Sequence, residues 1–160
     1  MSTRHLDLRT FDELQTEVMS LIRHPYHRAG QWSLGQNCQH VAKMLNQSID
    51  GFDFQIPWFI RIFSGWMKNR VLKSRSIPNG IQAPKLFLPD DQTPDADGVS
   101  QLLTAIHRYR HYTGPLQPSP LFGRLSRSEW DQLHLIHASH HLKFILPVNS
   151  PREGENPASD

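Results

Sequence analysis

SRSEWDQLHLIHASHHLKF, residues 126–144, is the segment whose pattern governs the predicted fold. Ser126 and Glu129 form a capping box, the usual signature of a helix start, and Pro147 forbids continuation of the helix. Apolar residues and histidines then recur at the three- and four-residue spacing of one helix face. The inward stripe predicted for this helix consists of Trp130, Leu133, Ile136, His137, His140, His141 and Phe144.

Four more helices are predicted by similar signals. Thr10 with Glu13 and Ser33 with Gln36 form two further capping boxes, and Trp32 is placed as a hydrophobic staple before the second. A third segment is rich in aromatic and apolar residues, which predicts a mostly buried helix. The predicted ranges are 10–25, 33–50, 57–75 and 97–112.

The connections between these helices complete an all-α fold. A stretch rich in proline and aspartate, residues 78–97, predicts a long irregular crossover, and residues 118–123 predict a turn. The sequence shows no convincing strand pair and no internal repeat. We therefore expect a single domain, residues 1–149, built as a four-helix bundle with an additional short helix, and a disordered tail at residues 150–160.

The composition excludes several classes of protein. The 160 residues carry a net charge of +2, which is too weak to indicate a nucleic-acid partner. The chain lacks an apolar run of about 18 residues and a signal-peptide pattern, so we expect a cytoplasmic protein. The single cysteine, Cys38, lies on a predicted apolar helix face and is expected to be a buried small hydrophobe rather than a nucleophile.

The histidines are the main indication of function. His137 and His141 are four residues apart, so on a helix both rings can tilt toward a single ion. A third ligand has to come from another helix, and His40 is the best donor. Three imidazoles that leave coordination positions open are typical of a catalytic metal ion. The alternative is that His137 and His141 are neutral core residues and that His40 lies at the surface.

Other histidines leave the ligand set open. His134 lies beside His141 on the helical wheel, and either His134 or His140 could replace one ligand. His107 and His111 form another pair four residues apart, but the arginines that flank them favour a solvated face. Ala138 follows His137, so the His-Glu-x-x-His motif of zinc proteases is absent and the sequence offers no general base.

Residues 58–75 combine aromatic side chains with basic ones and contain no acidic residue. A basic aromatic helix can lie on an anionic membrane. The basic residues gather toward the C-terminal end, however, where they complement the helix dipole, and the apolar half suits burial. The pattern therefore favours core or dimer packing over membrane contact.

Several sequence blocks occur in a fixed order and spacing between residues 30 and 146. They are WSLGQ at 32–36 leading to His40, SIDGF at 48–52, P-x-G-I-x-x-P at 78–84, F-G-x-L at 122–125, and Trp130, Leu133, His137, His140, His141, Leu142 and Phe144. Together these blocks resemble the DinB/YfiT-like superfamily of bacterial helical-bundle proteins, most closely an uncharacterised branch of it.

The resemblance implies a four-helix bundle that binds a divalent metal ion through His40, His137 and His141. It also implies a dimer as a common state, and metal-dependent hydrolysis or transfer reactions that use low-molecular-weight thiols. We therefore expect a zinc or nickel ion that acts as a Lewis acid on a small-molecule substrate. The alternative is a non-catalytic bundle with structural histidines, whose aromatic helix contacts a protein or a membrane.

Overall fold

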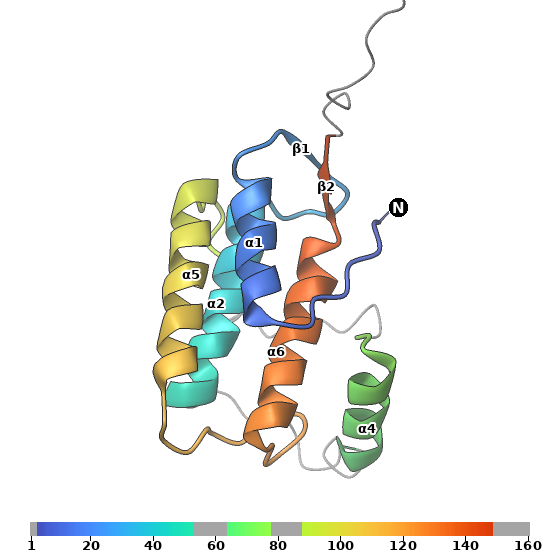
Figure 1. Cartoon of the computed structure of the whole chain (residues 1–160), viewed down its shortest axis with the longest axis vertical. Helices are drawn as coiled ribbons and strands as arrows, with labels where there is room; N and C mark the ends of the chain where they lie inside the picture. Colours follow the sequence, from blue (N-terminus) through green and yellow to red (C-terminus); the bar gives the residue numbers. More distant parts are fainter. Residues whose placement is uncertain (1–2, 53–63, 78–87, 149–160) are drawn as a thin grey trace, which may run out of the picture.

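The computed structural model describes residues 3–52, 64–77 and 88–148. Its helices run side by side, and two short strands lie at one end of them (Figure 1). No described helix combines the length and apolarity needed to cross a membrane. The described elements are α1 (Phe11–Leu21), β1 (Tyr26–Arg28), α2 (Leu34–Asp50), α4 (Ser64–Ser74), α5 (Asp95–His111), α6 (Arg127–Leu142) and β2 (Ile145–Pro147).

Complete capping boxes fix the starts of α2 and α6, as predicted. The Ser33 hydroxyl accepts from the Gln36 backbone N–H at 3.2 Å, and the Gln36 side chain accepts from the Ser33 N–H at 2.9 Å. Ser126 and Glu129 make the same pair of bonds at 3.2 and 2.8 Å. Each box satisfies two N–H groups that a helix start would otherwise leave unpaired, so both helices begin at a defined residue.

Helices α2 and α5 make the most extensive helix contact in the described chain, and glycines allow their backbones to approach. A Cβ atom built on Gly98 would lie 2.1 Å from the Gly35 carbonyl oxygen. The Asp95 carboxylate accepts from the Gly35 N–H at 2.8 Å and from the Tyr26 hydroxyl at 2.7 Å, and the Tyr26 oxygen accepts from the Leu34 N–H at 3.1 Å. The start of α5 thus also caps the start of α2.

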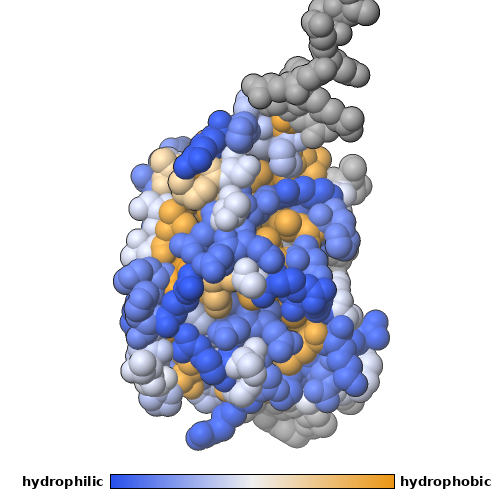
Figure 2. Space-filling model, in the orientation of Figure 1, coloured by the Kyte–Doolittle hydropathy of each residue, from blue (hydrophilic) through white to orange (hydrophobic). Residues whose placement is uncertain are grey.

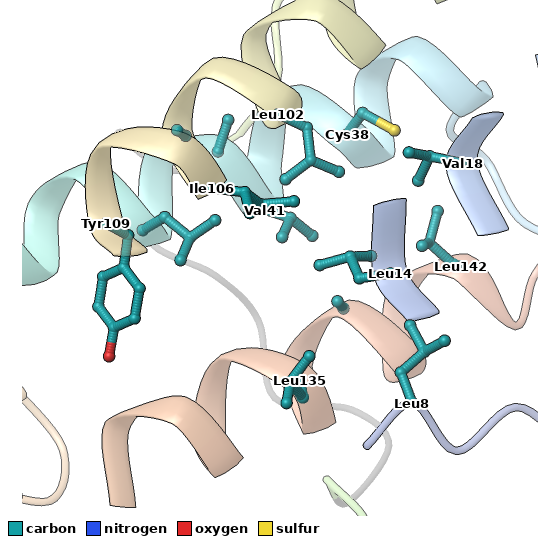
Figure 3. Packing of buried hydrophobic residues seen from close by; sticks show 14 of the residues in the cluster. Leu8, Leu14, Val18, Cys38, Val41, Leu102, Ile106, Tyr109, Leu135 and Leu142 are labelled. Carbon is teal, nitrogen blue, oxygen red and sulfur yellow. The ribbon is translucent and has the colours of Figure 1, made fainter. Parts of the chain in front are cut away.

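The core lies between α1, α2, α5 and α6 (Figure 3). Cys38 is fully buried, and burial raises the pKa of its thiol, so the prediction of a small core hydrophobe is confirmed. The Tyr109 hydroxyl points out of the apolar cluster and donates to Asp131 at 2.8 Å. The outer face in Figure 2 is mostly hydrophilic, with apolar side chains in small separate patches. Other core residues are Leu14, Val18, Val41, Leu102, Ile106, Leu135 and Leu142.

A histidine also belongs to this core. His134 is 1% exposed and stacks on the Trp130 ring, with ring centroids 5.0 Å apart. Its Nε2 lies 3.2 Å from the Ser48 hydroxyl oxygen, and that hydroxyl donates to the Leu45 carbonyl at 2.7 Å. Because the Ser48 proton is already committed, His134 Nε2 carries the proton and donates it. Burial lowers the pKa of His134 to about 3, so the ring is neutral at pH 7.

Three expectations about the elements are wrong. Strands β1 and β2 form an antiparallel pair, which sequence reasoning missed because each strand has three residues and they lie far apart in the chain. Helix α6 ends at Leu142, because the chain turns there to enter β2. The capping box at Thr10 is incomplete, since the Glu13 carboxylate accepts from the Arg9 N–H at 2.6 Å instead.

The expected buried helix at 57–75 is also corrected where the structure describes it. Helix α4 is mostly exposed: Val71 is its one buried side chain among those described, and Trp66 is 69% exposed. The earlier part of that predicted helix, residues 57–63, lies outside the described residues. The same holds for most of the crossover, residues 78–87, and for the predicted tail.

Replacing Gly98 with alanine tests the close approach of α2 and α5. The new methyl group would collide with backbone atoms of Gly35, which cannot move without separating the helices. We expect the free energy of unfolding to fall by about 1–3 kcal/mol despite the better helix propensity of alanine. Urea unfolding measures this change in the free energy of unfolding. Gly65→Ala is the control, since no atom of the described residues lies within 4 Å of its added Cβ. Equal stability of the Gly98→Ala protein and the parent would contradict the packing.

Replacing His134 with leucine tests the neutral core histidine. In the unfolded chain a histidine has a pKa near 6.5. Between pH 6.5 and about 3, residue 134 is therefore protonated in the unfolded state and unprotonated in the folded state. This proton makes the parent lose about 1.4 kcal/mol of stability per pH unit as the pH falls through that window. Urea unfolding from pH 7 to 4.5, with a chelator present, should give a shallower slope for His134→Leu. The control is His107→Leu at an exposed position, which should keep the parent's dependence of stability on pH. If His134→Leu also kept that dependence, the ring would be charged in the folded protein and the prediction would be wrong.

Candidate metal centre

The small sheet determines which helix ends meet. Strand β1 leads into α2, β2 follows α6, and they pair with Tyr26 opposite Pro147 and Arg28 opposite Ile145. The pairing is extended by a bond from the Ala29 N–H to the Phe144 carbonyl, at 2.8 Å. The first turns of α2 are thereby held beside the last turns of α6, at the end of the bundle that carries the sheet (Figure 1).

The three predicted ligands meet at this junction. His40 in α2 is buried, and His137 and His141 in α6 are partly buried. Each offers one ring nitrogen, and these nitrogens lie within 4.8 Å of one another. The Nε2 atoms of His40 and His137 are 3.1 Å apart. Two ligands of a tetrahedral zinc ion at about 2.1 Å are separated by roughly 3.4 Å, so this hydrogen-bonded pair is close to ligand spacing.

The protonation of the group suits a metal ion. Burial is the largest cause that lowers the pKa of both His137 and His141 well below the usual range, and the neighbouring imidazoles lower it further. Both rings are therefore neutral at pH 7, which is the form that binds metal. Nδ1 of His137 is buried and has no hydrogen-bond partner among the described residues. The hydrogen bond between Nε2 of His137 and Nε2 of His40 requires a proton on one of the two atoms, and the described contacts of His137 do not decide which.

Trp32 forms a wall of the site that sequence reasoning missed. Its ring is nearly parallel to that of His141, with centroids 5.5 Å apart, and tilted against that of His40 at 5.0 Å. Trp32, which the sequence placed as a staple for α2, thus contacts two of the candidate ligands. The available signal was its position just before Ser33, the cap of the helix that carries His40.

His140 and Lys143 lie next to the three ligands. The rings of His140 and His141 meet edge to face at 5.3 Å. The Lys143 ammonium donates to His140 Nδ1 at 3.3 Å. Burial and the Lys143 charge lower the pKa of His140 to about 4, so its ring is neutral and the proton is on Nε2. His140 is therefore a hydrogen-bond donor beside the site.

The remaining histidine candidates lie elsewhere. His134 is bonded to Ser48 in the core and is not part of the group of three, so it does not replace a ligand. His107 and His111 are exposed on α5 with their rings stacked at 4.2 Å, and the prediction of a solvated face is confirmed.

Comparison with known proteins gives a family but no activity. No curated protein and no solved structure matches the chain. A family model described as "Protein of unknown function (DUF1569)" matches residues 1–148. The chain therefore belongs to the DUF1569 family.

Proposed function

We propose that this protein is a DinB-like metalloprotein that holds a divalent ion, zinc or nickel, with His40, His137 and His141 and acts on a small molecule. The observation that carries the proposal is the convergence of three imidazole nitrogens within 4.8 Å, from histidines on two helices of one bundle. Helical bundles commonly build metal sites from side chains on facing helices. Imidazole is a preferred ligand of zinc and of nickel.

Three protein ligands leave room for a substrate, which is typical of a catalytic site rather than a sealed structural one. A divalent ion bound there supplies Lewis acidity, which polarises a carbonyl group and lowers the pKa of a coordinated water or thiol. The chain's own residues hold the site in shape. Trp32 limits movement of His40 and His141, and the capping box at Ser33 fixes where α2 begins.

The surroundings of the site favour thiol transfer over hydrolysis. Among the described residues, no carboxylate belongs to the group of possible ligands, so the described part of the site offers a coordinated water no acidic side chain within that group to take its proton. A thiol loses its proton with a pKa near 8.5 and needs less assistance. Cys38 is buried and its pKa is raised, so the thiol has to be a small molecule from solution.

The rival function is a non-catalytic contact module with structural histidines. The observation that favours it is the exposed surface of α4, where the Arg70 guanidinium lies 5.8 Å from the ring centroid of the exposed Trp66. Such a surface suits a protein partner or an anionic membrane. This rival predicts no stoichiometric metal ion, and liposome flotation would test its membrane form.

Metal content separates the two functions. We expect untagged protein, purified without chelators or a nickel column, to contain about one transition-metal ion per chain or to take up one on loading with zinc. The His40→Ala and His137→Ala variants should bind zinc at least about 100-fold more weakly. Removing a residue that hydrogen-bonds to a metal ligand already lowers metal affinity by up to about 100-fold, and removing the ligand itself should lower it at least as much. Elemental analysis and zinc titration measure both quantities.

A matched control is the His107→Ala variant, which removes one of two histidines at the same four-residue spacing from an exposed helix face. It should retain the full metal content. A parent protein that takes up no zinc or nickel would refute the metal centre, and so would full zinc binding by His137→Ala protein that remains folded.

A further inference from the structure

Among the described residues, the charged side chain beside the candidate centre is the ammonium of Lys143. All three candidate ligands are histidines, which bind a metal ion as uncharged imidazoles, so a divalent ion held by them would keep its full positive charge in a partly buried site. Burying an uncompensated charge is unfavourable unless an opposite charge accompanies it. No described carboxylate belongs to this group of possible ligands, and Lys143 brings a further positive charge next to His140, whose ring packs on His141. An anionic ligand from solution would supply such an opposite charge.

Lys143 adds to this imbalance. Its ammonium contacts His140 Nδ1 at 3.3 Å and lies 5.1 Å from the Phe144 ring centroid, and no described carboxylate is within ion-pair distance of it. Several other cations of the described chain do have acidic partners, for example Lys68 with Glu129 at 2.7 Å. A cation at the end of α6 also complements the helix dipole. The dipole does not explain why the lysine contacts a neutral imidazole, which is a weak partner for an ammonium group.

A second donor stands beside Lys143. Because the ammonium donates to Nδ1 of His140, the proton of that ring is on Nε2, and the ring packs edge to face on the ligand His141. Lys143 and His140 are both only partly buried, so a ligand from solution can reach them. An ammonium and an imidazole N–H side by side are suited to the oxygens of a carboxylate or a phosphate.

We propose that the small molecule bound at this centre carries an anionic oxygen group, a carboxylate or a phosphate, and that Lys143 and His140 bind this group beside the ion. This inference rests on the proposed function and adds the substrate class to it. Lys143 supplies charge and His140 supplies a neutral donor, while Trp32 presents a flat aromatic wall on the side of His141 and His40. The arrangement selects an anion over an uncharged molecule of the same shape.

The test compares binding of benzoate and phenyl phosphate with that of uncharged benzamide. Zinc-loaded protein is titrated calorimetrically with each probe. We expect at least about 10-fold tighter binding of one anion than of benzamide, and about 10-fold weaker binding of that anion by a Lys143→Gln variant with unchanged zinc content. Lys143→Arg keeps the charge and should retain most of the affinity. Whichever anion binds more tightly identifies the group as a carboxylate or a phosphate.

The control is Lys73→Gln, which removes an exposed cation of α4 and should leave anion binding unchanged. Two results would overturn the inference while leaving the metal centre intact: zinc-loaded protein that binds benzamide as tightly as both anions, or Lys143→Gln protein with parental anion affinity. Failure of the parent to bind zinc would overturn the proposed function itself, together with this inference.

Discussion

The antiparallel pairing of β1 with β2 is the constraint on which the candidate centre depends. Each strand has three residues, yet one leads into α2 and the other follows α6. Their hydrogen bonds, with that from Ala29 to Phe144, hold the first turns of one helix against the last turns of the other. His40 lies in the second turn of α2, and His137 and His141 lie in the last turns of α6. Without the pairing, the bundle could still bury its core while these ends separated.

The buried and partly buried histidines of the bundle have two different roles. In the core, His134 is neutral and its Nε2 donates to Ser48, so it contributes to packing as a satisfied polar residue. At the end of the bundle, His40 and His137 bring two nitrogens to 3.1 Å, a spacing at which an ion could lie between them. Within α6, His134 therefore stabilises the core, whereas His137, one turn later, belongs to the candidate site. Lys143 lies beside this site, where its ammonium contacts His140 and no described carboxylate.

Much of this arrangement could be predicted from local signals. Capping boxes at Ser33 and Ser126 located the two helices that carry the candidate ligands. Four-residue spacing with a donor on a second helix named the three histidines whose ring nitrogens lie within 4.8 Å of one another. The sequence could not reveal the strands, because three-residue strands carry no periodicity and their pairing joins distant segments. The helical wheel alone placed His140 on the inward face and did not tell whether His134 could be a ligand. In the structure, His134 hydrogen-bonds in the core to Ser48, which lies 86 residues away in the chain. Contacts between distant segments, such as Trp32 on His141, have no signature in local pattern.

A crystal structure of the zinc-loaded protein, with anomalous diffraction recorded at the zinc edge, tests the central claim most directly. The account predicts one strong anomalous peak per chain, about 2.1 Å from a ring nitrogen of each of His40, His137 and His141, with at least one further coordination position filled by solvent or a small ligand. A peak at another place in the protein, or zinc held by His137 and His141 without His40, would contradict it.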